Sequence, residues 1–276
     1  MKKTILVTGA SSGIGKSIAQ YFISKGWNVA ATMRNPSNEK ELEETDSLKL
    51  YSLDVINEES IMSAIENVIS DFGKIDVLVN NAGYGAIGIF EKSTQKEIQK
   101  QFDVNVFGVM QTTKAILPHM RANKSGTIIN ITSVGGRLTF PIYSVYNATK
   151  WAVEGFAESL QYEVKPFGIR IKNVEPGAIK TDFYSRSQNL FENKEITAYD
   201  NYEQVVFKNT QQAGAEAPDP EIVAKTVYKA ANDASYRIRY LTGNTQSKML
   251  MKMRKLLPLT TFMNLVSGAV TKGLKK

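Results

Sequence analysis

The chain has 276 residues, 42% of them hydrophobic, and a formal net charge of +7 at pH 7. This length and composition are typical of one large globular α/β domain. The chain has no cysteine, which excludes disulfides, thiolate metal sites and cysteine nucleophiles, and its one histidine, His119, argues against a histidine triad or a multi-histidine metal site. We therefore expect no bound metal, and we interpret His119 as a surface or helix-end residue.

The positive charge gathers towards the carboxyl end. No acidic residue follows Asp233, and nine lysines and arginines lie beyond it, so the rest of the chain has a net charge of −2 (+7 minus +9). We expect a near-neutral body, residues 1–246, and a basic amphipathic extension, residues 247–276. The start of the chain runs straight into an apolar strand, and no apolar stretch approaches about 18 residues, so we expect neither a secretory signal nor a membrane span.

The first predicted strand, residues 5–7, ends in a glycine-rich turn that opens a helix predicted over 17–25. Glycines let a pyrophosphate approach the backbone, and a helix N-terminus offers it free N–H groups. The spacing Gly-x-x-x-Gly-x-Gly differs from the usual dinucleotide fingerprint, so a bare turn is the alternative interpretation. The cofactor candidates in this turn are Gly9, Ser11, Ser12, Gly13, Ile14 and Gly15.

The second predicted strand, residues 28–32, is followed by Met33 and Arg34. A site that prefers NAD usually carries an acidic residue here to hold the ribose 2′-OH. Methionine cannot do so, whereas a guanidinium can pair with the 2′-phosphate of NADP, and nearby serine hydroxyls can add contacts. The sequence therefore favours NADP(H) over NAD(H); the alternative is that Arg34 is solvated surface.

The next two strands, predicted over 48–53 and 75–79, flank a helix over 58–72 and end in the polar turns 54–55 and 80–83. Asparagine side chains can bond to turn backbone without any ligand, and we weigh that interpretation for Asn80. A mostly helical stretch over 94–120 is interrupted near Asn105 and Gly108. Asparagine is a poor helix former, so Asn105 calls for a special explanation.

The fifth predicted strand, residues 126–132, places Ser133 at its carboxyl end, and a long helix follows over 146–165. Residues four apart share a helix face, so Tyr146 and Lys150 point into one site. A free phenol keeps its proton until roughly pH 10, but a nearby ammonium favours the phenolate and makes acid/base work effective near neutrality. This predicts Tyr146 as general acid/base, with Ser133 bonded to a substrate oxygen.

Two further strands, over 169–175 and 237–241, and a helix over 220–232 complete an alternating pattern. It predicts a doubly wound, mostly parallel seven-stranded sheet of Rossmann type, with helices on both faces and the ligand across the carboxyl ends of the strands. Residues 182–218 are expected to be irregular or weakly helical and rich in aromatic residues. Tyr143 lies three residues before Tyr146 and can shape the same cleft.

In the extension, residues 247–276, apolar residues alternate with lysines in a helical manner. Such a segment can lie on an anionic membrane surface. We favour the alternative that its apolar residues cap the pocket or a neighbouring subunit while its lysines face water. Its cations form no recognisable nucleic-acid motif, so we expect no nucleic-acid partner.

The ordered set of motifs resembles the short-chain dehydrogenase/reductase family, in its compact single-domain form. The resemblance rests on 8–15, 80–83, Asn105, the Ser133, Tyr146 and Lys150 trio, and Pro176-Gly177 with Thr181, over the chain up to about residue 182. It implies a catalytic set of Asn105, Ser133, Tyr146 and Lys150, with Asn105 holding a water that passes protons to the lysine. It implies further cofactor contacts from Asp54, which accepts from the adenine, and from Val55, Asn81, Ala82, Gly83, Tyr146, Lys150, Pro176, Gly177, Ile179 and Thr181.

By this resemblance, residues 1–246 form one catalytic domain with a substrate lid at about 182–218. We expect an NADP(H)-dependent oxidoreductase of the cytoplasm that interconverts a carbonyl and an alcohol. The aromatic residues of 182–218 indicate an apolar or bulky substrate; the alternative is that they only pack the lid down. The protein is expected to form a homodimer or homotetramer. The alternatives are a non-catalytic cofactor-binding regulatory protein of the same fold and a dehydrogenase of lipids, steroids or retinoids at a membrane surface.

Overall fold

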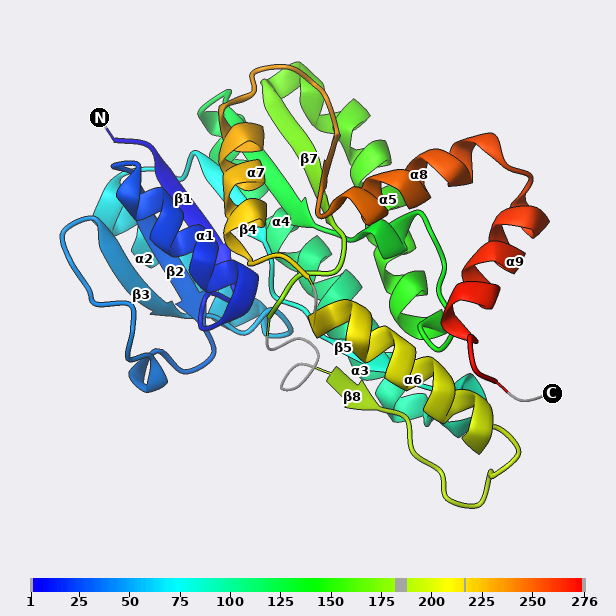
Figure 1. Ribbon diagram of the computed structural model, residues 1–276. Helices are drawn as coiled ribbons and strands as arrows, with labels where there is room; N and C mark the ends of the chain where they lie inside the picture. Colours follow the sequence, from blue (N-terminus) through cyan, green and yellow to red (C-terminus); the bar gives the residue numbers. More distant parts are fainter. Residues whose placement is uncertain (1, 182–187, 216, 275–276) are drawn as a thin grey trace.

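The computed structural model describes residues 2–181, 188–215 and 217–274, and is built around a seven-stranded parallel sheet (Figure 1). Its strands, in spatial order, are β3 (Leu48–Ser52), β2 (Asn28–Met33), β1 (Thr4–Thr8), β4 (Val77–Asn80), β6 (Gly126–Ile131), β7 (Ile169–Pro176) and β9 (Arg239–Thr242). The strand order reverses beside β1, which makes the carboxyl ends of β1 and β4 a switch point for ligand binding. The predicted fold class is confirmed.

Helices cover both faces of the sheet (Figure 1). One face carries α1 (Gly13–Ser24) and α7 (Glu221–Asn232), and the other carries α2 (Glu58–Phe72), α4 (Gly108–Ala122) and α5 (Ser144–Val164). Successive side chains of a strand point to opposite faces. Accordingly Ile5 and Val7 are buried in the core with α1 and α7, while Leu6 is buried in the core on the other side.

A row of buried asparagines crosses three central strands. Asn80, Asn130 and Asn173 are in register on β4, β6 and β7. Asn80 Nδ2 donates to Asn130 Oδ1, and Asn130 Nδ2 donates to Asn173 Oδ1, both at 3.0 Å. Thr112 Oγ1 on α4 donates to Asn80 Oδ1 at 2.6 Å. Asn80 therefore has a structural role, as we considered, but its partners are side chains of the sheet and α4.

We expect Asn80→Ala to lower the free energy of unfolding by roughly 1–3 kcal/mol, because it leaves the buried Asn130 Oδ1 without its donor, whereas Thr112 Oγ1 keeps the Gly108 carbonyl as acceptor. Urea unfolding measures the change. The exposed Asn67 of α2 provides the control, since Asn67→Ala is expected to stay within about 0.5 kcal/mol of the unmutated protein. Equal unfolding midpoints for the two variants would contradict the structural role of the row.

The predicted interruption of the helix at 94–120 is confirmed. The segment forms α3 (Gln95–Phe102), a π-helical turn over Asp103–Phe107, and α4. Single π-helical turns inside longer helices are frequent at functional sites. Short 3₁₀ turns elsewhere occupy Pro36–Asn38, Phe90–Lys92, Val134–Gly136 and Lys165–Phe167.

Residues 188–215, within the lid segment 182–218 that was expected to be irregular or weakly helical, contain a strand and a full helix instead; residues 182–187 and 216 lie outside the described residues. Strand β8 (Gln188–Leu190) pairs with β5 (Gly85–Ile87), and α6 spans Asp200–Ala215. Long-range contacts hold α6: the Lys92 ammonium pairs with Asp200 and Glu203 in its first turn, at 3.0 and 2.6 Å. These partners are about 110 residues away in sequence, so local pattern did not reveal the helix.

The C-terminal extension is helical, as predicted, and forms α8 (Thr245–Leu256) and α9 (Leu259–Val270). Met251, Phe262 and Val266 are buried against the loop after β6, at Val134 and Leu138. The extension therefore packs on its own chain. None of the helices in the described residues is long and apolar enough to cross a bilayer.

Candidate active site

The predicted site residues follow neighbouring strands of the sheet. Gly9 follows β1, Asn81 follows β4, and Ser133 lies just beyond β6. Pro176 ends β7, and Gly177 follows it. These four strands are consecutive in the sheet and run the same way, so their carboxyl ends lie along one edge. The sequence motifs are thus assembled at this edge.

The glycine-rich loop fits tightly against the turn after β4. Gly9 has a φ of +68°, and a Cβ there would lie 2.9 Å from Ala82 Cα. Asn81 Nδ2 donates to the carbonyls of Thr8 and Gly9, at 2.9 and 3.0 Å. The Thr8 hydroxyl accepts from the backbone N–H groups of Asn81 and Ala82, both at 3.0 Å. Thr8 was not named as a site residue from the sequence. A polar side chain at the end of an apolar strand could have indicated it.

The amino end of α1 faces the loop after β7. Ser12 precedes the helix, and its side chain does not cap the first turn. The Thr181 side chain would lie 3.5 Å from a Cβ on Gly13. A hollow lies beside them, lined in part by Gly13, Lys180 and Thr181. Backbone N–H groups at a helix start beside a glycine loop suit a pyrophosphate.

The end of β2 separates Met33 from Arg34. Met33 is only 3% exposed and packs in the core with α1 and α7, whereas Arg34 is exposed. Farther along, Glu39 pairs with Lys16 of α1 at 3.0 Å and accepts from the backbone N–H groups of Lys40, Glu41 and Leu42. The carboxylate of Glu39 is therefore already neutralised and hydrogen-bonded within the chain.

Of four further cofactor candidates, Val55, Ile179 and Ile14 also pack in the core, whereas Asp54 does not. Val55 is buried and would contact a Cβ on Gly108 at 2.8 Å. Ile179 is buried in the core with α1 and α7, and Ile14 packs against the same core. Asp54 is half-buried, and its Oδ1 accepts from the Ile56 N–H at 3.2 Å. Their contacts with a cofactor stay predictions.

Ser133, Tyr146 and Lys150 meet around the glycine turn after β6. A Cβ on Gly135 would lie 3.4 Å from Ser133 Oγ and 3.6 Å from Tyr146 Cε1, so the serine and the tyrosine flank one small space. Ser133 Oγ accepts from the Gly135 N–H at 3.0 Å. Lys150 Nζ lies 5.7 Å from the centre of the Tyr146 ring, one helical turn along α5. The geometry brings the predicted trio together.

Lys150 is anchored at the edge of the sheet. Its Nζ donates to the carbonyl of Ile131, the last residue of β6, at 2.9 Å. Burial lowers the pKa of Lys150 to about 8, and the Glu154 carboxylate acts in the opposite direction. The ammonium form of Lys150 therefore prevails at and below neutral pH, next to the tyrosine.

Two asparagines fix the elements that carry the trio. Asn105 Nδ2 donates to the Tyr84 carbonyl at 2.8 Å and to Thr149 Oγ1 at 3.3 Å, and its Oδ1 accepts from the Tyr84 N–H at 3.1 Å. Thr149 lies on α5 between Tyr146 and Lys150, so the π-helical turn is tied to the helix of the trio. Asn147, once its amide is oriented to satisfy both ends, donates to the Gly135 carbonyl and accepts from the Phe140 N–H. The proton-relay water predicted at Asn105 stays a prediction.

An apolar cluster lies next to Tyr146. Ile142, Tyr143 and Val206 are buried in it together with Ile87 and Ile89. Partly buried aromatic residues complete it: Phe140, Tyr146, Tyr199, Tyr202 and Phe207. Because Val206 and Phe207 belong to α6, the helix in the predicted lid region packs apolar side chains beside the tyrosine.

A cluster of charged residues, which was not predicted from the sequence, begins at Glu154, one helical turn after Lys150 on α5. Arg239 Nε lies 3.1 Å from both Glu154 Oε2 and Glu175 Oε1, and its other end pairs with Glu158. Arg137 Nη1 lies 3.4 Å from Glu175 Oε2. Glu154 is 4% exposed and Glu175 is 1% exposed. Burial and the neighbouring Glu154 raise the pKa of Glu175 to about 7.

This raised pKa predicts a pH-dependent stability. The folded protein keeps the Glu175 proton to a higher pH than the unfolded chain does, so the unfolding free energy falls as pH rises from about 4.5 to about 7. We expect Glu175→Gln to remove up to about 3 kcal/mol of that fall. Urea unfolding at pH 5 and pH 8 measures it, and parallel pH profiles of variant and unmutated protein would contradict the prediction.

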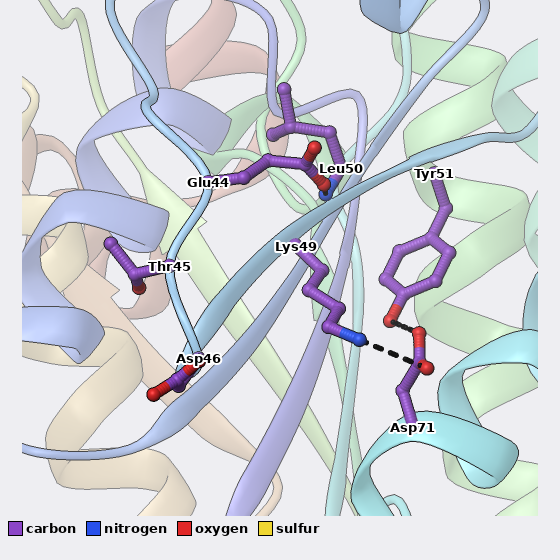
Figure 2. A pocket seen from close by; sticks show the side chains of 7 residues that line it. All are labelled: Glu44, Thr45, Asp46, Lys49, Leu50, Tyr51 and Asp71. Carbon is purple, nitrogen blue, oxygen red and sulfur yellow. Dashed lines mark hydrogen bonds and ion pairs between the residues drawn. The ribbon is translucent and has the colours of Figure 1, made fainter.

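Two other features lie apart from this site. A hollow at the edge strand β3 is lined by residues that include Lys49, Tyr51 and Asp71; Lys49 and Tyr51 both bond to Asp71, at 2.9 and 2.7 Å (Figure 2). His119 is half-buried in the last turn of α4, where its Nε2 accepts from the Ile75 N–H at 3.1 Å, in keeping with its predicted place at a helix end. Among the described residues, no group of histidine, aspartate and glutamate could hold a metal ion.

Residues 3–190 match the family model described as short chain dehydrogenase. The chain belongs to the short-chain dehydrogenase/reductase family. It is therefore an oxidoreductase, as the motifs predicted.

Individual relatives agree with this assignment. A protein of Bacteroides thetaiotaomicron named 3-ketodihydrosphingosine reductase is 44% identical over 179 residues, which are 65% of each chain. The crystal structure of a short-chain dehydrogenase from Streptomyces avermitilis is 34% identical and superposes with a TM-score of 0.80 over 97% of this chain and 98% of that one. The structure of ElxO with NADP bound is 29% identical, with a TM-score of 0.72 over 87% of this chain and 98% of that one.

Proposed function

We propose that this protein is an NADP(H)-dependent oxidoreductase that interconverts an apolar carbonyl compound and its alcohol. The observation that carries the proposal is the position of Lys150, one helical turn from Tyr146, with Ser133 on the other side of Gly135. The phenol can exchange a proton with a substrate oxygen, the ammonium can stabilise the phenolate, and the serine hydroxyl can hold that oxygen.

In the proposed mechanism, bound nicotinamide supplies or accepts the hydride. Tyr146 gives its phenolic proton to the substrate oxygen during reduction and takes it back during oxidation. Lys150, held by the Ile131 carbonyl, stabilises the phenolate left behind and can bind the nicotinamide ribose. Ser133 positions the substrate oxygen, and the Asn105 region supports the return of protons to Lys150.

The preference for NADP(H) rests on Arg34. Its exposed guanidinium lies at the end of β2 while Met33 faces the core, so neither residue at the end of this strand is acidic, as one would be in a typical NAD site. A solved relative, ElxO, binds NADP. The Arg34 guanidinium is proposed to pair with the 2′-phosphate.

The substrate is proposed to be a ketone or alcohol with a long or bulky apolar part. Support comes from the apolar cluster of Ile142, Tyr143, Val206 and their aromatic neighbours beside Tyr146. The name of the Bacteroides thetaiotaomicron relative, 3-ketodihydrosphingosine reductase, is that of an enzyme for such a ketone. Burial of apolar substrate surface against these side chains would favour binding by about 0.8 kcal/mol for each methylene.

NADPH oxidation with a series of ketones of increasing chain length tests the proposal. We expect activity, with kcat/KM rising along the series and NADPH used in preference to NADH. NADPH binding without turnover of any carbonyl or alcohol would instead support the alternative, a cofactor-binding regulatory protein of the same fold. The complete trio argues against that alternative, since binding alone needs no such acid and cation.

A further inference from the structure

Helix α9 is a surface helix without a charged residue. Nine of its twelve residues, Leu259–Val270, are exposed, and none of the twelve is Asp, Glu, Lys or Arg. Only Phe262 and Val266 are buried. The outer face of a helix in water is normally charged or polar. The exposed residues of α9 include the uncharged polar residues Thr260, Thr261, Asn264 and Ser267, but also the large apolar residues Leu259, Met263 and Leu265. These exposed apolar side chains are the feature to explain.

The exposed apolar residues continue through the turn that joins α8 to α9. Leu256, the last residue of α8, is 82% exposed, and Leu259, the first residue of α9, is 51% exposed. Met263 and Leu265 on α9 are 50% and 49% exposed. The two helices form a hairpin at one side of the molecule, away from the sheet (Figure 1).

Cations flank these apolar residues in the sequence. Lys252 and Lys255 are exposed in the second half of α8, and Lys272 is exposed just after α9. The Arg254 guanidinium lies 6.0 Å from the centre of the Phe262 ring. The sequence has no acidic residue after Asp233, so the hairpin carries positive charge only.

We propose that the α8–α9 hairpin docks the protein on an anionic lipid surface. The docking surface consists of the apolar residues Leu256, Leu259 and Met263, of which the last two share a side of α9, and the cations Lys252, Lys255 and Lys272. Leucine and methionine side chains enter the boundary between headgroups and acyl chains, and the lysines contact lipid phosphates. The hairpin lies in the plane of the interface.

A second copy of the chain fits this surface less well. In a two-fold dimer the same surface patch meets itself, so both sides of the interface would carry cations and no acidic residue to pair with them. Like charges that face each other across an interface repel. An anionic lipid surface offers the opposite charge together with the apolar layer, and this complementarity decides between the two partners.

The proposed lipid contacts lie on the outer side of the hairpin, while its inner side packs on the rest of the protein. Phe262 and Val266 pack on Leu138, and Asn209 of α6 donates to the carbonyls of Val270 and Lys272, at 2.8 and 3.1 Å. The residues that hold the hairpin on the protein therefore differ from those proposed to contact lipid. Substitutions on the outer side can test binding without disturbing the fold.

Co-sedimentation of the full-length protein with vesicles tests the proposal. We expect binding to phosphatidylcholine vesicles that contain phosphatidylglycerol, little binding to phosphatidylcholine alone, and weaker binding as salt is raised. Lys252→Glu combined with Lys255→Glu is expected to weaken binding by about 25-fold or more, because each cation near an anionic surface contributes about a factor of five. Leu256→Ser combined with Leu259→Ser is expected to abolish it.

Matched variants separate the docking surface from general effects. Lys114→Glu combined with Lys229→Glu makes the same change in net charge on α4 and α7, and Tyr162→Ser removes a side chain of α5 that is also 82% exposed. We expect both to bind like the unmutated protein. Circular dichroism confirms that each variant is folded.

Three results would overturn the proposal. The first is a folded, unmutated protein that does not sediment with anionic vesicles. The second is an equal loss of binding in the Lys114 and Lys229 control, which would show an effect of net charge alone. The third is that the double leucine variant keeps vesicle binding but has a lower molar mass by light scattering than the unmutated protein, which would assign the surface to a second copy.

Discussion

Replacing Tyr146 by phenylalanine is expected to lower kcat for carbonyl reduction by about 10²–10⁴-fold, the range contributed by a well-placed general acid. The change removes one hydroxyl and keeps the ring that lies beside Lys150 and, at 5.9 Å between centres, Tyr143. The fold and the glycine loop should therefore be unaffected. Steady-state NADPH oxidation gives kcat, and a fluorescence titration gives the Kd for NADPH, which we expect to change by less than about threefold.

Tyr162 provides the matched control for this experiment. It lies on the same helix, α5, and is 82% exposed, so Tyr162→Phe tests whether loss of any tyrosine hydroxyl from this helix affects the rate. We expect its kcat to equal that of the unmutated protein. If the Tyr146 variant kept most of its activity, the acid/base role and the mechanism built on it would be wrong.

Replacing Arg34 by aspartate is expected to reverse the cofactor preference. A charge-assisted hydrogen bond contributes about 1.5–3 kcal/mol, and the new carboxylate also repels a 2′-phosphate and can accept from a 2′-OH. We expect the ratio of kcat/KM for NADPH to that for NADH to fall by at least about 100-fold. Initial rates with each cofactor at a fixed substrate concentration measure the ratio.

Lys40 gives the control for charge. It is exposed in the same segment after β2, so Lys40→Asp makes the same change in net charge six residues farther on. Its cofactor ratio should stay close to that of the unmutated protein. Equal use of NADPH and NADH by the unmutated protein would disprove the assignment of Arg34, while leaving the role of Tyr146 untouched.

Some structural features were unpredictable because their causes are long-range. Helix α6 is held by Lys92, and β5 and β8 pair across about 100 residues of chain. The cluster of Glu154, Glu175 and Arg239 joins three elements, α5, β7 and β9, that are far apart in the sequence, so no local pattern indicates it. In the extension, no pattern could tell that Phe262 is buried while Met263 is exposed, because that depends on Leu138.

The sequence by itself determined the class of sheet and the order of the motifs along the chain, whereas the order of the strands came from the structure. Short apolar runs are followed by Gly9, Asn81 and Ser133, and one helix face carries Tyr146 and Lys150. Both patterns follow from the local periodicity of strands and helices, which can be read from the sequence. The tertiary structure alone decided what surrounds them. Packing brought Asn105 onto Tyr84 and Thr149, placed α6 beside Tyr146, and left one side of α9 uncovered, because contacts between distant residues depend on the whole fold.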